Sequence, residues 1–325
     1  MFRRKSFFQP LVVTLILAVA PHAATAKPKK DKTVPKGTPV LWRAPLNIEK
    51  RNLRVGPGGD AMSPNLKRIK FLKEEKGGYS TKFRISDGSG RVWVAKVGKE
   101  AQSETSAVRL LWAVGYETEV NYLVPRLTIP GKGTFENVRL EARPKSEKRL
   151  DEWNWEQNPF IGKPEFDGLR VMMVLLNNWD IKNSNNVILL ERKGDRNILR
   201  YVISDLGATF GKTGHIPFFW RITRSRNNPE DFEKAKFIDG VDHGLVDFHF
   251  GGKKREMFDN IPADRARWIG VWLSRLSEDQ IKDAFRAANY NPEEIDILTE
   301  AVRGRISELV NLRSGTNTSV QLKRH

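Results

Sequence analysis

Short apolar runs separated by glycine-rich turns predict a group of β-strands in the first half of the chain. The five runs cover residues 69–73, 82–86, 92–97, 122–130 and 135–142. Their connections contain Gly77-Gly78, Asp87-Gly88-Ser89-Gly90 and Gly131-Lys132-Gly133. Runs of this length joined by such turns are typical of antiparallel strands. Between the third and fourth runs, Ala107, Leu110, Leu111 and Val114 keep helical spacing, which predicts a helix over 103–112 that ends at Gly115.

Helical spacing dominates the second half. Residues 168–177 are apolar on nearly every side, which predicts a buried helix. Three more helices are predicted over 262–273, 278–288 and 292–309. Pro262 is expected at the first helical position, and Ser277 and Asn291 each open a capping box. The two halves together predict an α+β protein with a sheet-rich first part and a mostly helical second part.

One hairpin interrupts the helical half. Apolar runs at 187–190 and 198–203 flank a short polar segment, which is a hairpin pattern. Polar residues stand just before the first strand and just after the second: Asp180, Lys182, Asn185, Asp205 and Gly207. An antiparallel pair returns both groups to one end, with its strands about 5 Å apart. Carboxylates and an amide gathered there suit a hard, oxygen-loving cation such as Mg²⁺.

The order Asp-x-Lys-x-x-Asn, hairpin, Asp-x-Gly resembles the catalytic and metal loops of protein kinases. Asn178-Trp179 stands where that family usually has His-Arg, and Leu206 stands where it usually has Phe. With these departures the chain resembles the divergent kinase-like branch that includes the HipA-type kinases, the phosphatidylinositol 3-/4-kinase-like proteins and the secretory-pathway casein kinases. The resemblance covers roughly residues 68–310. It implies a two-lobed protein-kinase-like fold with a small antiparallel β lobe and a mostly helical large lobe.

On the nucleotide side, the resemblance implies that Lys96 holds the α- and β-phosphates of ATP. Val94-Ala95-Lys96 is close to the family's strand motif. Glu104, expected in the first turn of the helix, is the candidate partner of Lys96, and Glu100 is the alternative. The phosphates would be covered by the first glycine turn, through the backbone N–H groups of Gly77, Gly78 and Ser80. The hinge that meets the adenine would fall near 141–144.

On the transfer side, the resemblance implies that Asn185 and Asp205 hold Mg²⁺ or Mn²⁺. Asp180 would orient the acceptor hydroxyl and take its proton, and Lys182 would neutralise the γ-phosphate. The loop after Gly207 would occupy the position of an activation segment. Aromatic and arginine residues in it form either a substrate or polyanion surface or a packed loop: Phe218, Phe219, Trp220, Arg221, Arg224 and Arg226. His215 is expected to be an ordinary loop residue, and His243 and His249 are not expected to bind a metal.

Composition narrows the class of protein. The net charge of +17 favours anionic partners, such as nucleotide phosphates, anionic lipids or glycans. The chain has no cysteine, which excludes disulfides, thiol chemistry and cysteine-based metal sites. Arg3-Arg4-Lys5, the apolar run 11–20 and Ala24-Thr25-Ala26 predict a Sec-type signal peptide cleaved after Ala26. We therefore expect a periplasmic or extracellular protein with no transmembrane segment after cleavage.

The sequence thus predicts an exported, ATP- and Mg²⁺-dependent kinase-like phosphotransferase that moves the γ-phosphate to a hydroxyl of a protein, lipid or sugar. The alternative is a catalytically weak or inactive kinase-like module that binds an anionic envelope component or a partner protein. Nucleic-acid binding rests on charge alone, and the export signal argues against it. The expected divisions are a signal peptide, a basic linker with an irregular wrap, a small β-rich lobe, a large helical lobe and a frayed tail, over residues 1–26, 27–66, 67–144, 145–312 and 313–325.

Overall fold

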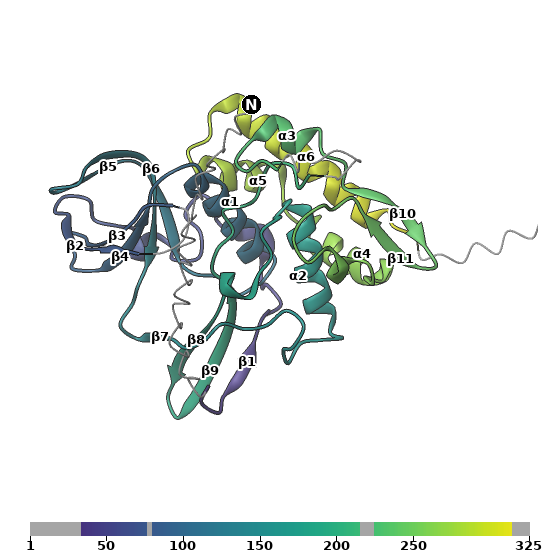
Figure 1. Ribbon diagram of the computed structural model, residues 1–325, viewed down its shortest axis with the longest axis horizontal. Coiled ribbons are helices and arrows are strands. Elements are labelled where there is room, and N and C mark those ends of the chain that lie inside the picture. Colours follow the sequence, from purple (N-terminus) through teal and green to yellow (C-terminus); the bar gives the residue numbers. More distant parts are fainter. Residues whose placement is uncertain (1–33, 77–79, 215–223, 314–325) are drawn as a thin grey trace, which may run out of the picture. The chain divides into compact units, whose positions relative to one another are not determined.

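The computed structural model describes residues 34–76, 80–214 and 224–313 (Figure 1). The predicted signal peptide, the Gly77-Gly78 turn, His215 and residues 218–221 of the predicted substrate surface lie outside these ranges. None of the helices in the described ranges combines the length and the apolar composition needed to span a bilayer. The elements below belong to one compact unit that begins at Val34.

The first part of the chain forms the predicted five-stranded antiparallel sheet, in the order β2-β3-β4-β6-β5. Its strands are β2 (Lys70–Glu75), β3 (Lys82–Ser86), β4 (Val92–Lys96), β5 (Asn121–Ile129) and β6 (Gly133–Ala142). The inserted helix, α1 (Glu100–Ala113), begins three residues before the predicted start at Ser103. Lys99 precedes it without a side-chain cap, so the sequence carries no start signal there. As a result Glu100, and not Glu104, lies in the first turn.

The two faces of this sheet differ sharply in polarity. One face carries an apolar core that includes Phe83, Trp93 and Leu140. Directly opposed residues share a face of an antiparallel sheet, and Lys96 lies opposite both Lys82 and Arg139. The second face therefore carries charged side chains. This is the face from which Lys96 reaches toward α1.

The predicted hairpin is present as β8 (Asn186–Lys193) and β9 (Arg196–Ile203), joined by the two residues Gly194 and Asp195. Gly194 has a φ of +59°, a value that glycine tolerates in tight hairpin turns. Two three-residue strands extend the hairpin: β7 (Glu147–Arg149), antiparallel to β8, and β1 (Thr38–Val40), parallel to β9. The sequence predicts a basic linker where β1 forms and no strand where β7 forms. Each strand is too short for a periodic signal and forms by pairing with the hairpin.

The remaining elements are mostly helical and pack around one large apolar core. They are α2 (Pro164–Leu175), α3 (Pro229–Glu233), β10 (Ile238–Asp242), β11 (Leu245–Phe248), α4 (Ala263–Leu273), α5 (Glu278–Arg286) and α6 (Pro292–Val310). Short 3₁₀ turns cover Ile48–Lys50, Asp60–Met62, Asn183–Asn185 and Arg255–Phe258. Both predicted capping boxes, at Ser277 and Asn291, are present. Pro262 is the residue before α4, not its first helical residue, and α2 begins four residues earlier than predicted.

The helices of the second part pack on one another, and α1 joins them. Helix α4 packs on both α2 and α6, α5 packs on α6, and α1 contacts α5 (Figure 1). Helix α2 leads directly into the loop that holds Asp180. The turn after the hairpin meets the first turn of α1, because Ser103 Oγ donates to the Gly207 carbonyl at 3.0 Å.

Candidate active site

Lys96 is the centre of the site. Its side chain is only 2% exposed, and its Nζ lies 2.8 Å from a carboxylate oxygen of both Glu100 and Glu104. The same Nζ lies 3.3 Å from Asp205 Oδ1. Burial alone would lower the pKa of Lys96, but the neighbouring carboxylates outweigh it and raise that pKa. Lys96 is therefore a permanently charged group, held by acidic residues from α1 and from the hairpin end.

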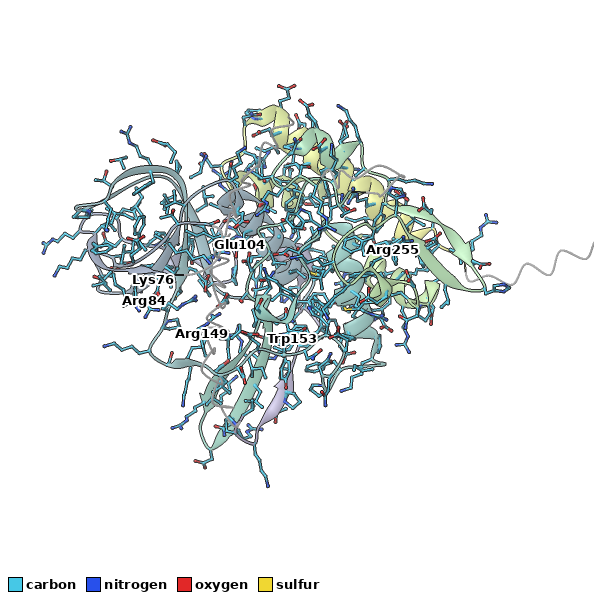
Figure 2. The ribbon with its side chains drawn as sticks, viewed as in Figure 1. Lys76, Arg84, Glu104, Arg149, Trp153 and Arg255 are labelled. Atoms are coloured by element: carbon cyan, nitrogen blue, oxygen red, sulfur yellow. The ribbon has the colours of Figure 1, made fainter. Side chains whose placement is uncertain are left out.

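The two glutamates that we had treated as alternatives both pair with Lys96, but their other contacts differ. Glu104, labelled in Figure 2, is also 3.1 Å from Arg139, and both side chains are almost fully buried. Glu100 accepts a hydrogen bond of 2.6 Å from Ser80 Oγ and pairs with Arg226. Burial would raise the pKa of Glu100, yet Lys96 and Ser80 hold it below its usual range. Glu104 thus belongs to the interior of the first part, whereas Glu100 links three separate segments.

Asp205 and Gly207 join the hairpin end to α1. Asp205 Oδ1 accepts a hydrogen bond of 3.2 Å from the Gly207 backbone N–H as well as contacting Lys96. Burial opposes ionisation of Asp205, but these contacts keep its pKa lowered. A Cβ on Gly207 would lie 2.7 Å from Glu100 Cβ, closer than real side chains approach. Only glycine allows this close contact, and Ser103 Oγ donates to the Gly207 carbonyl at 3.0 Å.

Asn185 connects Asp205 to Asp180. The Ser204 backbone N–H, next to Asp205 in the chain, donates to the Asn185 carbonyl at 2.7 Å. The Asn185 side-chain amide donates in turn to the Asp180 carbonyl at 2.8 Å. Lys96 thus contacts Asp205, the neighbouring Ser204 backbone bonds to Asn185, and Asn185 bonds to the Asp180 backbone. The structure brings together the groups that the hairpin pattern placed at one end.

The oxygens of Asn185 and Asp205 suit a Mg²⁺ ion. In the described part of the chain, neither Asn185 Oδ1 nor Asp205 Oδ2 has a hydrogen-bond donor. The described part of the chain contains no group of three or more His, Cys, Asp or Glu side chains arranged to hold a metal. Mg²⁺ commonly binds through one or two protein oxygens and completes its shell with water and substrate phosphates. One amide oxygen and one carboxylate oxygen fit that mode of binding.

Two lysines contact the carboxylate of Asp180. Lys182 Nζ lies 2.8 Å from Oδ2, as expected for a residue of the same loop, and Lys253 Nζ contacts Oδ1. Burial would raise the pKa of Asp180, but the hydrogen bonds from both lysines outweigh it and lower that pKa. The backbone N–H of Lys253 donates to the Trp179 carbonyl at 2.9 Å, which fixes this loop beside Asp180.

Sequence reasoning missed Lys253 and Arg139. Gly251-Gly252-Lys253-Lys254 marks a basic loop in the sequence, but nothing local indicates that it reaches a loop 73 residues earlier. Trp179, at the position where the kinase family has Arg, also organises this region. The guanidinium groups of Arg224 and Arg226 lie over its ring, at 5.4 and 4.7 Å from the ring centre. The described arginines of the predicted substrate surface are therefore ordered against the Asp180 loop.

The order of these parts is that of a two-lobed protein-kinase-like fold. A lysine ends the third strand of a five-stranded antiparallel sheet, and the helix that follows supplies its glutamate partner. After the sheet come a helix, the Asp180 loop, a hairpin and the Asp205-Leu206-Gly207 turn. The α+β fold predicted from the sequence is thus confirmed.

No family model and no curated protein matches this chain. Among solved structures, the proinflammatory kinase CtkA of Helicobacter pylori aligns with 77% of this chain and 96% of its own, at 13% identity and a TM-score of 0.45. The Rio2 kinase of Chaetomium thermophilum, solved as an ADP/Mg²⁺-phosphoaspartate complex, aligns with 74% of this chain and 72% of its own. Its identity is 11% and its TM-score 0.31.

Proposed function

We propose that this chain is a kinase-like phosphotransferase that uses Mg²⁺ (or Mn²⁺) and a nucleoside triphosphate, with ATP as the expected donor. The acceptor is a hydroxyl group. One observation carries the proposal: Lys96 contacts Asp205, the adjacent Ser204 backbone bonds to Asn185, and Asn185 bonds to the Asp180 carbonyl, so residues from distant parts of the sequence meet at one place. Each of these residue types has a defined task in phosphoryl transfer.

The chain's own residues would divide the reaction as follows. Lys96, kept charged by its carboxylate neighbours, would contact the α- and β-phosphates, and Lys182 would offset charge on the γ-phosphate. The acceptor oxygen forms a new bond to the γ-phosphorus, the bond from that phosphorus to the β-phosphate oxygen breaks, and the nucleoside diphosphate leaves. Asp180 takes the acceptor proton. Asn185 and Asp205 would hold Mg²⁺, which neutralises the phosphate charge as it develops.

We also propose that the protein acts outside the cytoplasm. The support is the N-terminal pattern of three basic residues, a short apolar run and a small-residue cleavage site ending at Ala26. Alkaline phosphatase fused after residue 40 tests this directly, because the enzyme becomes active only on export. A fusion that lacks residues 2–26 is the control. Equal activity of the two fusions would reject export.

Nucleotide binding and transfer by the purified full chain test the catalytic proposal. We expect Mg²⁺ with ATP to raise the melting temperature of the wild type and labelled phosphate to reach an acceptor or the protein itself. Asp205→Asn should lose the nucleotide effect, whereas Asp180→Asn should keep it and lose transfer. Asp242→Asn is the matched control, because that side chain is 88% exposed.

Absence of nucleotide binding by the wild type would reject the proposal. The alternative function is a non-catalytic module for an anionic envelope component, and the net charge of +17 supports it. That function predicts salt-sensitive binding of a polyanion together with no response to nucleotide.

A further inference from the structure

Positive charge exceeds negative charge around the Asp180 loop. Five cationic side chains of the described ranges lie at or next to this loop, and we call them the cationic rim: Lys182, Arg224, Arg226, Lys253 and Lys254. In the described ranges, the carboxylates of Asp180, Glu100 and Glu156 contact members of the rim. The arrangement therefore has positive charge to offer to a further anion. Of the five side chains in the cationic rim, only Lys182 has a role in the phosphoryl transfer proposed above.

The backbone beneath the rim is fixed, while its lysine head groups reach solvent. Lys253 N–H bonds to the Trp179 carbonyl, and Arg224 Nη2 donates to the Gly251 carbonyl at 2.9 Å. Gly251 N–H donates to Thr213 Oγ1 at 3.0 Å. The side chain of Lys253 is 47% exposed although its Nζ touches Asp180. Lys253 can therefore exchange Asp180 for another anion without movement of the loop.

In the present arrangement, both carboxylate oxygens of Asp180 accept hydrogen bonds from lysines. An acceptor hydroxyl needs one of these oxygens in order to transfer its proton. We propose that the acceptor is a hydroxyl-bearing segment of an acidic polypeptide. This inference rests on the phosphotransferase activity proposed above. A carboxylate of this segment takes Lys253 from Asp180 and so frees Asp180 for the hydroxyl. Lys253 is in this sense a positioning residue that couples acceptor charge to catalysis.

A groove beside the rim favours a polypeptide as the acceptor. The groove has a volume of about 490 Å³, and its apolar lining includes Ile161, Phe166 and Met257. It adjoins the rim because Glu156, which also lines it, pairs with Lys254. The groove also adjoins the Asp180 loop, since the backbone N–H of Trp155, another lining residue, donates to Asn183 Oδ1 at 3.3 Å.

The groove and the rim together favour a ligand that carries both apolar and acidic side chains. An extended peptide provides carbonyls, apolar side chains and carboxylates along one chain. Arg255, labelled in Figure 2, follows Lys254 in the sequence and is exposed.

The test uses the purified full chain and two synthetic serine peptides that differ only in flanking glutamates or glutamines. Fluorescence anisotropy measures binding between about 50 and about 200 mM NaCl. We expect the acidic peptide to bind about tenfold more tightly, and that preference to fall as salt rises. Lys253→Gln should abolish the preference. Ile161→Ser, at a side chain 54% exposed, should weaken both peptides equally.

Lys234→Gln, just after α3, is the matched control, because this lysine is 72% exposed and pairs only with Glu230 among the described ion pairs. Its binding of both peptides should equal that of the wild type. In transfer assays, Lys253→Gln should raise KM for the acidic peptide and leave KM for the neutral peptide unchanged. Retention of this KM difference in the variant would contradict a positioning role for Lys253.

Two results would overturn the inference: equal binding of the acidic and neutral peptides, or binding of phosphatidylglycerol vesicles in place of either peptide. Parallel titration with Mg²⁺ and ATP separates this inference from the proposed function. If the wild type binds nucleotide but does not prefer the acidic peptide, the acidic acceptor is rejected and the phosphotransferase is not. Loss of nucleotide binding in the wild type rejects the phosphotransferase as well.

Discussion

The substitution Lys96→Met tests how much one buried cation contributes to the free energy of unfolding. Methionine is about as long as the lysine stem and is apolar, so the change removes charge and hydrogen bonds more than volume. Glu100 and Glu104 would lose a partner that lies 2.8 Å from each. Glu104 keeps Arg139 at 3.1 Å, and Glu100 keeps Arg226. The variant therefore leaves buried carboxylates partly, not wholly, uncompensated.

Removal of one partner of a buried ion pair costs about 3–5 kcal/mol, because the remaining charge stays desolvated. Since two arginines remain, we expect about 3 kcal/mol at neutral pH. The sign of the pH dependence follows from the carboxylates. In the wild type, contacts with Lys96 lower the pKa of Glu100 and Asp205. Without the cation, burial raises those pKa values, so the destabilisation is largest near pH 7 and shrinks as falling pH protonates the carboxylates.

Urea unfolding followed by tryptophan fluorescence at about pH 7 and about pH 5 measures this difference. The control is Lys73→Met on β2, where the lysine is 57% exposed and lies 3.5 Å from Glu75. An exposed pair contributes at most about 1 kcal/mol. The reasoning would be refuted if both variants lost the same stability, or if the effect of Lys96→Met grew as the pH fell.

Three further outcomes are expected. Gly207→Ala should destabilise the protein by about 1–3 kcal/mol in thermal unfolding, because its new Cβ meets Glu100. The control Gly240→Ala, where the new Cβ enters open space, should change the free energy of unfolding by less than about 0.5 kcal/mol. Arg305→Met should cost about 2–4 kcal/mol in urea, because the buried guanidinium bonds three backbone carbonyls, while Arg303→Met on the same helix, 53% exposed, should cost under about 1 kcal/mol. The wild type should lose stability as the pH falls below about 4, since the lowered pKa values of the site's carboxylates stabilise the fold only while these groups are ionised; no loss in urea midpoints between about pH 7 and pH 3 would contradict this.

Much of the architecture was predictable because its signals are local. Short apolar runs and glycine-rich turns marked the five strands of the first sheet, and the capping boxes at Ser277 and Asn291 marked two helix starts. The spacing of Asp180, Asn185 and Asp205 around a hairpin also predicted that these groups meet, because an antiparallel pair must return its ends to one place. Such features depend on residues close in sequence, so they can be predicted without knowledge of the tertiary structure.

Other features were decided only by tertiary structure. Strands β1 and β7 exist because the hairpin offers them partners, and their three residues carry no pattern of their own. Glu100 and Glu104 lie one helical turn apart, so spacing alone could not choose between them, and both reach Lys96. Lys253 meets Asp180 through a backbone hydrogen bond to Trp179 that spans more than seventy residues. Contacts of this kind depend on how distant segments pack, and no local periodicity or spacing in the sequence encodes that packing.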